Sequence, residues 1–423
     1  MKTIKIILAL FSICLYHLAF SQDKYSISGF AELDHISFLK EKDNKINSRN
    51  QGILQLDVAS NFSSKYSFFS SIEFRNDLSD ETRDRVYVDE LYMDLFFKKW
   101  DLRVGKQIIS WGKADGFNPM NTLSPTDYSD VLDTEDEDIG IFALNGKFYL
   151  GSMELQLVYS TLFTSSLLPS GTSRWQVGTE STVNIQGSNY NTIYNINVSK
   201  PVDKLSSSQF AIKLSQQFNN LDFSLAYFNG YNHIPQLIQS VGTIDNTANT
   251  AEINIEQKYY RHQVISGDFS LALGKYIFKG EGSLFIPQDI PVDDQYFQYV
   301  VGLDRTFSNV IADNNLFVII QWMHEITNNG ISYAGRDFNH LFQKNIMCRL
   351  EMDLSSSTTL SLQGMYAIEY EDYYIRPELT YNISDGLNLS LLADLLGGND
   401  DKGGLFSGYS DNGRVQAKLK YSF

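Results

Sequence analysis

Apolar and polar side chains alternate with a period of two along the chain from Tyr25 onward. Successive side chains of a β-strand point to opposite faces, so this period predicts strands with one apolar and one polar face. The final segment has apolar residues at Val415, Ala417, Leu419, Tyr421 and Phe423 and polar residues at Gln416, Lys418, Lys420 and Ser422. We count about eighteen such segments, each of about the 9–11 residues that a tilted strand needs to cross a bilayer.

The connections between these segments alternate between short and long. Short turns include residues 63–65, 98–100 and 384–386, and long connections fall near residues 39–50, 75–85, 111–138, 164–208, 232–259, 326–342 and 396–411. Short turns on one side and longer loops on the other are typical of transmembrane barrels. The predicted fold is therefore all-β, a transmembrane antiparallel β-barrel of about eighteen strands, with sixteen as the alternative count. An even number places both chain ends on the side of the short turns.

The N-terminal segment has the features of a secretory signal peptide. Lys2 and Lys5 precede an apolar run from Ile6 to Phe20, which is shorter than the roughly 20 residues that a membrane-spanning helix needs. We predict that residues 1–22 are a cleaved signal peptide, with an uncleaved anchor as the alternative. Residues 23–423 would then form a single barrel domain in the outer membrane, with external loops at 164–208 and 232–259.

The composition of the chain limits the classes of partner and indicates the character of the barrel interior. The chain has 34 basic and 50 acidic residues, a formal net charge of -16, which gives no electrostatic footprint for nucleic acid. Cys348 is the one cysteine outside the signal peptide, so no internal disulfide is expected. Charged residues of both signs occupy the polar faces of the strands, which favours a hydrated lumen because charges are costly to bury in hydrocarbon.

Two short stretches carry a family resemblance. The last strand, ending at Phe423, resembles the assembly signal of Gram-negative outer-membrane barrels, which implies the barrel-assembly machinery as a partner. Residues 102–107, LRVGKQ, followed by Trp111-Gly112, Pro119 and Asp127, are similar to the L-R-x-G-x-Q…W-G…P…D stretch of porin-like families, many of which have no assigned substrate. In porins the loop after the fifth strand often folds inward, so the resemblance implies that residues 111–138 narrow the pore here.

The charged residues expected at the constriction or in the lumen come from several strands and from this loop: Arg75, Glu90, Asp94, Arg103, Asp115, Asp127, Asp130, Lys147, Arg349, Glu351, Arg376 and Glu378. The stretch 127–138 is rich in acids, which could select cations or bind a hard metal, or could simply be a solvated loop. Its spacing matches no calcium loop, and we predict no metal site and no cofactor. Arg103 and Lys106 are candidates for the opposing wall, although strict alternation puts Lys106 on the lipid face, which predicts a bulge nearby.

The preferred function is that of an outer-membrane porin or channel for passive diffusion of small hydrophilic solutes or ions, with a mild cation preference from the acid excess. Partners would be outer-membrane lipids and these solutes, and a homo-oligomer is left open. The alternative is a barrel for adhesion, secretion or lipoprotein binding, with Arg174 and Trp175 in the loop 164–208 as a partner or sugar surface. An outer-membrane hydrolase is the third hypothesis; its best candidates are His324, Glu325 and His340, but no catalytic spacing is present and we predict that the chain is not an enzyme.

Overall fold

A computed structural model describes residues 25–43, 45–133, 138–169, 173–176, 181–202, 204–288, 295–311, 313–327, 340 and 343–423. The expected signal peptide, residues 1–22, lies outside these residues. Most of the expected connection 326–342 lies outside them as well.

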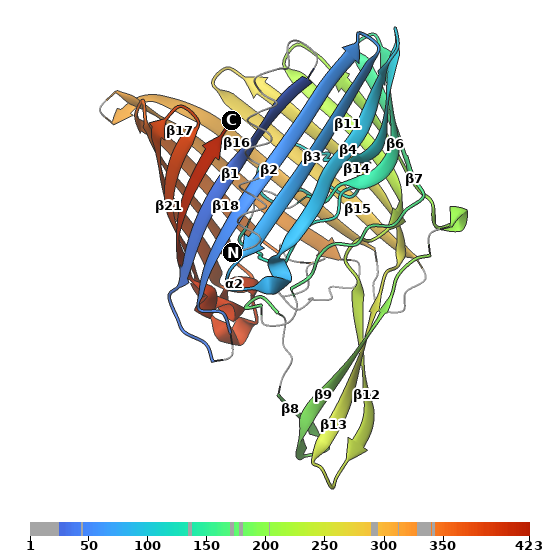
Figure 1. The fold of residues 1–423 in the computed structure, drawn as a ribbon, viewed down its shortest axis with the longest axis vertical. Coiled ribbons are helices and arrows are strands. Elements are labelled where there is room, and N and C mark those ends of the chain that lie inside the picture. The colour runs from blue at the N-terminus through green and yellow to red at the C-terminus, as the bar shows by residue number, and fades with distance from the viewer. Residues whose placement is uncertain are drawn as a thin grey trace.

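Eighteen of the described strands form one closed antiparallel barrel (Figure 1). They are β1 (Tyr25–Phe38), β2 (Ser48–Ser63), β3 (Tyr66–Asp77), β4 (Arg85–Phe96), β5 (Trp100–Gln107), β6 (Ile141–Leu150), β7 (Met153–Ser160), β10 (Gln209–Gln217), β11 (Leu221–Tyr231), β14 (Arg261–Leu273), β15 (Tyr276–Gln288), β16 (Tyr296–Ile311), β17 (Asn314–Thr327), β18 (Asn345–Ser355), β19 (Thr358–Ala367), β20 (Asp372–Ser384), β21 (Leu387–Gly398) and β22 (Arg414–Ser422). The predicted fold class and the count of eighteen are confirmed, and the alternative of sixteen strands is wrong.

Closure occurs between the first and last strands. β1 pairs antiparallel with β22, from Phe30 opposite Ser422 to Phe38 opposite Arg414, and β1 also pairs with β2. Every barrel strand therefore has two hydrogen-bonded neighbours. This matters because hydrocarbon offers no partners to backbone N–H and C=O groups, so an unpaired strand edge would be costly in a bilayer.

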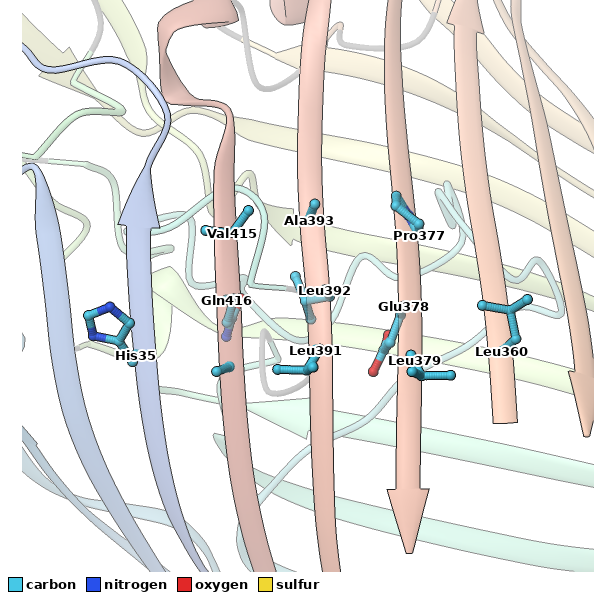
Figure 2. A pocket seen from close by; sticks show the side chains of 11 residues that line it. His35, Leu360, Pro377, Glu378, Leu379, Leu391, Leu392, Ala393, Val415 and Gln416 are labelled. Carbon is cyan, nitrogen blue, oxygen red and sulfur yellow. The ribbon is translucent and has the colours of Figure 1, made fainter. Parts of the chain in front are cut away.

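The outward faces of the strands are apolar and exposed. Leu33 is 65% exposed, Leu225 62% and Leu391 50%, although such side chains are usually buried in a folded protein. Figure 2 shows part of this face, where side chains of β19, β20, β21, β22 and β1 line a shallow apolar cavity of about 430 Å³. An apolar belt of this kind fits acyl chains around the barrel.

The inward faces are less polar than the sequence predicts. Val264, Val300 and Met347 point inward and are at most 1% exposed. Val300 pairs with Glu281 across β15 and β16, so the two residues share the inward face. These apolar side chains are buried because the segment between β5 and β6 fills part of the barrel and packs against them.

Two connections expected to be plain loops contain strands. β8 (Thr182–Ile185) and β9 (Ser188–Ser199) lie between β7 and β10, and β12 (Gln236–Asp245) and β13 (Thr250–Lys258) lie between β11 and β14. Together they form a four-stranded sheet in which β9 and β13 run parallel, and Figure 1 shows this external sheet projecting from the end of the barrel where α2 lies. Residues 164–208 and 232–259 are thus partly strand.

Among the residues that the structure describes, helical structure is confined to short segments in the connections. They are η1 (Glu81–Arg83), η2 (Leu205–Ser207), η3 (Asp400–Lys402), α2 (Leu405–Gly408) and η4 (Ser410–Asn412). Within the described part of the chain, no helix has the length and apolar character needed to cross a membrane.

Two neighbouring residues of β19 test the orientation of the wall. Leu362 is on the outward face and 40% exposed, whereas Gln363 pairs with Arg349 and Arg376 on the inward face. We expect Leu362→Arg to destabilise the barrel in lipid vesicles by about 2–4 kcal/mol because it places a charge in hydrocarbon, and Gln363→Arg to cost much less. Urea unfolding of the two variants in vesicles measures the difference, and equal losses would show that the faces are assigned incorrectly.

Candidate functional site

The described part of the connection between β5 and β6, residues 108–133 and 138–140, enters the barrel and is called the lumen loop here. At its start, the backbone N–H of Ile108 donates to Glu90 Oε1 at 2.9 Å. Three residues later, the indole N–H of Trp111 donates to Gln156 Oε1 on β7 at 3.1 Å. These contacts with inward-facing side chains of β4 and β7 give the start of the loop an inward course, whereas a narrowing of the pore by residues 111–138 stays a prediction.

The lumen loop then reaches β15 on the far wall. The backbone N–H groups of Lys113 and Ala114 both donate to Glu281 Oε2, at 2.6 and 3.0 Å. Asp115 Oδ2 lies 2.9 Å from the amine of Lys279. One buried carboxylate and one ion pair therefore hold this part of the loop across the lumen.

An apolar contact supports the same part of the loop. Phe117 packs, with Ala114, against inward-facing side chains of β16, β17 and β18, namely Val300, Ile319, Met323 and Met347. These side chains would otherwise face the lumen, so the hydrophobic effect favours a loop that covers them.

The returning half of the lumen loop is held by arginines. Asp127 Oδ2 lies 2.7 Å from Arg85 Nη1. Asp130 Oδ2 lies 2.7 Å from both Arg49 Nη1 and Arg414 Nη1. These partners belong to β4, β2 and β22, so the loop is fixed to the side of the barrel where the first and last strands meet.

Asp130 stays ionised in this environment. Its burial favours the neutral acid, but attraction to Arg414, Arg49 and Arg83 outweighs burial and holds its pKa far below the ordinary value of 3.8. A group whose pKa is depressed by folding contributes stability above its unfolded pKa and loses that contribution only as the pH falls through the folded pKa. Burial lowers the pKa of Arg83 to about 10, so this arginine is also charged at neutral pH.

These pairs revise the interpretation of the acidic stretch 127–138. Asp127 and Asp130 anchor the loop instead of presenting a free acidic ring, and Asp138 accepts a hydrogen bond from Asn121 Nδ2 at 2.8 Å. Glu135, Asp136 and Glu137 lie outside the described residues. Across the described part of the chain, no group of three or more potential ligands is placed to hold a metal ion.

A second group of predicted lumen residues lines a cavity on the short-turn side of the loop. The cavity has a volume of about 400 Å³, and its charged lining residues are Asp94, Asp101, Arg103, Lys147, Glu154 and Lys213. Arg103 Nε lies 2.7 Å from Asp94 Oδ1, and Lys147 Nζ lies 3.9 Å from Glu154 Oε1. Three acids and three bases make the local charge balanced.

The remaining predicted lumen residues are divided between buried pairs and the open lumen. Arg75 is paired with Glu73 at 3.0 Å and is buried, and Arg376 is paired with Asp394 at 2.6 Å. Arg349 and Glu351 form a pair at 2.6 Å whose side chains are 45% and 37% exposed. Glu378 accepts a 3.4 Å hydrogen bond from Thr380 Oγ1. The twelve predicted residues thus lie on or against the lumen, but they do not form one ring.

Lys106 does not line a constriction. Its amine lies 2.5 Å from the backbone carbonyl of Val88 and 3.7 Å from the ring centre of Tyr87. The predicted irregularity is present on the partner strand β4, where pairing with β3 shifts by one residue at Asp89. Gly105 allows β4 to approach closely, because a Cβ here would collide with the carbonyl oxygen of Leu91.

A second segment crosses the external mouth, and no pattern in the sequence indicated it. This mouth strap consists of residues 161–169 and 173–176. It is bonded to the lumen loop by the backbone N–H of Tyr128, which donates to Leu167 O at 2.8 Å, and by that of Leu167, which donates to Thr126 O at 3.1 Å. The strap therefore ties the lumen loop to the mouth.

Arg174 and Trp175 fix the end of the mouth strap. The guanidinium of Arg174 donates to the carbonyls of Lys40, Ile46 and Asp411 and to the side chains of Asn47 and Asn412. Trp175 is 3% exposed and packs edge-on against Tyr409 at 5.0 Å. The hypothesis that these two residues form a partner or sugar surface is wrong, since both are buried.

Comparison with known proteins places the chain in a family. Residues 37–306 match the family model described as "Protein of unknown function (DUF1302)". The chain belongs to this family. No curated protein matches it.

Several solved structures have a similar fold. A loop-deletion mutant of OmpT, an outer membrane protein of Vibrio cholerae, is 9% identical with a TM-score of 0.45, covering 95% of this chain and 100% of that one. A mutant of the Rh. blastica porin is 10% identical with a TM-score of 0.44, covering 94% and 100%. Salmonella typhi OmpF in complex with daunomycin is 10% identical with a TM-score of 0.42, covering 95% and 98%.

The residues proposed for catalysis do not share one site in this family member. Glu325 Oε2 lies 2.8 Å from His340 Nδ1, and both side chains are at most 1% exposed. Gln298 also donates to Glu325, at 2.8 Å. His324 lies on the opposite face of β17 with Tyr299 and Trp322. The grouping of all three as one candidate site is therefore wrong.

The anchoring role of Asp130 can be tested by comparison with Asp133, an acid of the same loop that is paired more weakly. We expect Asp130→Asn to destabilise the protein by about 3–5 kcal/mol, because it leaves Arg49 and Arg414 buried without a carboxylate. Asp133→Asn serves as the control, since Asp133 is 30% exposed and lies 3.7 Å from Arg83; its loss should cost less than about 1 kcal/mol. Urea unfolding combined with limited proteolysis of the lumen loop measures both effects. Equal behaviour of the two variants would refute the anchoring role.

Proposed function

We propose that this protein is an outer-membrane channel through which small hydrophilic solutes or ions diffuse passively. The observation that carries the proposal is the course of the lumen loop, which is bound to opposite walls and leaves charged side chains in the remaining lumen. Arg349 and Glu351 are the best example, because they face inward and are about half exposed. Solvated charges inside a barrel favour a water-filled path for polar solutes.

The charge of this path suggests weak ion selectivity. The acid excess of the chain predicts a cation preference, but the acids of the lumen loop are paired with arginines. The cavity on the short-turn side carries as many bases as acids. Because the loop acids Asp127 and Asp130 are paired and this cavity is balanced in charge, we expect cations and anions to pass at similar rates.

The proposed function includes the surroundings of the barrel. Outer-membrane lipids would cover the apolar belt, and the barrel-assembly machinery would insert the chain after removal of the signal peptide. Diffusion down a gradient needs no bond chemistry, so we propose neither catalytic activity nor a cofactor. A homo-oligomer is compatible with this function and is not required by it.

Planar-bilayer recording of the refolded protein tests the channel. We expect ion conductance from the wild type, a reversal potential close to zero in a salt gradient, and a larger conductance when a short Gly-Ser linker replaces residues 113–132. Replacing the external hairpin 236–258 serves as the control, which should leave conductance unchanged because this hairpin lies outside the lumen. If neither the wild type nor the loop-shortened variant conducts, the channel proposal fails.

The external sheet favours partner binding as a second candidate function. Ile196, Val241 and Leu237 are 54%, 53% and 46% exposed. The register of β9, β12 and β13 puts them on one face around Ile253 and Ile255, which are themselves buried. The opposite face is mostly polar, with Asn195, Asn197, Ser240, Glu252, Asn254 and Glu256, although it also carries Ile193 and Ile238. An apolar face that is exposed beyond the barrel is typical of an interaction surface.

Photo-crosslinking in intact cells tests this second function. A crosslinking amino acid at Val241 should give a defined adduct with a partner protein, whereas the same group at Ser240, its neighbour on the opposite face, should give none. Mass spectrometry of the adduct identifies the partner. Identical crosslinking at both positions, or none at either, would argue against a docking role for this face.

A further inference from the structure

A small uncharged cavity lies between the lumen loop and the wall formed by β14, β15 and β16. Its lining includes Asn121 from the lumen loop, Ser166 from the mouth strap, His233 after β11, His262 on β14 and Tyr296 on β16. Among the residues that the structure describes, none that lines this cavity is an Asp, Glu, Lys or Arg. The contrast with the six charged residues around the cavity on the short-turn side points to a different kind of occupant.

His262 is a polar side chain in the lining of the cavity. Its side chain is 4% exposed, and neither ring nitrogen has a hydrogen-bond partner within the described part of the chain. Its neighbours Phe228, Tyr260 and Phe285 approach through their rings, with centroids 5.6 to 6.0 Å away. A buried polar group without a partner is destabilising, so an occupant that bonds to this imidazole would be stabilising.

Other side chains add both donors and acceptors at the cavity. Asn121 Oδ1 is buried and has no hydrogen-bond partner in the described chain, while its Nδ2 donates to Asp138. His233 Nδ1 lies 2.6 Å from the carbonyl of Thr164. Burial lowers the pKa of His233 despite nearby backbone carbonyls, so this imidazole is neutral at neutral pH. The site therefore offers hydrogen bonds without a compensating charge.

An aromatic surface completes the lining. Phe285 and Tyr296 stack at 4.7 Å with an interplanar angle of 10°, and Phe117 of the lumen loop is also part of the lining. The volume of about 100 Å³ is several times the roughly 10–15 Å³ that one water requires by the same measure. The space is thus sufficient for a small solute but not for a macromolecule.

We propose that this cavity binds a small neutral polyol, of the class of a monosaccharide, on the external side of the lumen loop. The inference rests on the proposed channel function and assigns that channel a solute class. A charged ligand would lose its hydration without gaining a counter-charge, and an apolar ligand would leave His262 and Asn121 unpaired. Hydroxyl groups can both donate to and accept from these side chains, and the C–H faces of a sugar can cover the aromatic rings.

The position of the cavity explains how binding would act on transport. Asn232 and His233 immediately follow β11, and His262 is the second residue of β14, so the cavity lies at the loop end of these strands. Ser166 of the mouth strap donates its backbone N–H to His233 O at 3.0 Å. A solute arriving from outside would therefore meet this site before it passes the lumen loop, and its flux would saturate as the site fills.

Sugar-dependent recording and calorimetry test the proposal with glucose and sorbitol as probes. We expect either probe, added on the external side, to reduce the ion current saturably. His262→Phe should weaken the apparent affinity about tenfold or more, and His262→Gln, which keeps a donor and an acceptor, should recover part of it. His324→Phe, which alters a histidine on the outward face of β17, should leave the affinity unchanged. Isothermal titration calorimetry in detergent should give the same ranking of the variants.

The outcomes separate this inference from the channel proposal. Ion conductance without any saturable effect of the sugars, and no heat of binding, would overturn the sugar site while leaving the channel intact; the cavity would then hold water only. Sugar binding that depends on His262 but occurs in a protein that never conducts would support the site and refute the channel. If His262→Phe fails to fold, Asn121→Ala provides the same comparison, and an unchanged affinity in that variant would count against the site.

Discussion

The structure depends on one constraint. Every backbone N–H and C=O group of the barrel must find its hydrogen-bond partner within the wall, because the surrounding hydrocarbon offers none. In hydrocarbon an open sheet edge has no hydrogen-bond partners, so the chain is stable in a bilayer only when β1 meets β22. Closure fixes which face of every strand looks outward, and alternation then distributes the side chains. The apolar belt and the polar lumen are two results of this one constraint.

The lumen loop solves a second problem, which is how to hold an irregular segment inside a barrel. Arginines from β2, β4 and β22 meet carboxylates of the loop, while the apex covers apolar side chains of β16 to β18. Buried ion pairs contribute little net stability compared with apolar packing, but removal of one partner is costly. The arrangement therefore specifies a single position for the loop more than it adds to the free energy of folding.

Much of the barrel could be predicted because period-two alternation and the spacing of turns are local properties. The strand count, the common side of both ends and the outward faces follow from them. Which charged residues pair could not be predicted, since Asp130 and Arg414 are far apart in the sequence and meet only after closure. The same holds for Arg174, whose partners lie in two other connections, and for β9 and β13, whose parallel pairing joins two separate insertions. Apolar residues that face inward, such as Val300, interrupt the alternation of apolar and polar residues in the sequence. They do so because the lumen loop covers them in the folded chain.

The partners of Arg174 carry information about the order of assembly. Lys40 and Ile46 belong to the connection after the first strand, and Asp411 belongs to the connection before the last one. These carbonyl groups converge only when the two ends of the sheet have been joined. The guanidinium of Arg174 can therefore make all of these hydrogen bonds only in the closed barrel. In a nascent chain whose first and last strands have not yet paired, the mouth strap would not be held in place.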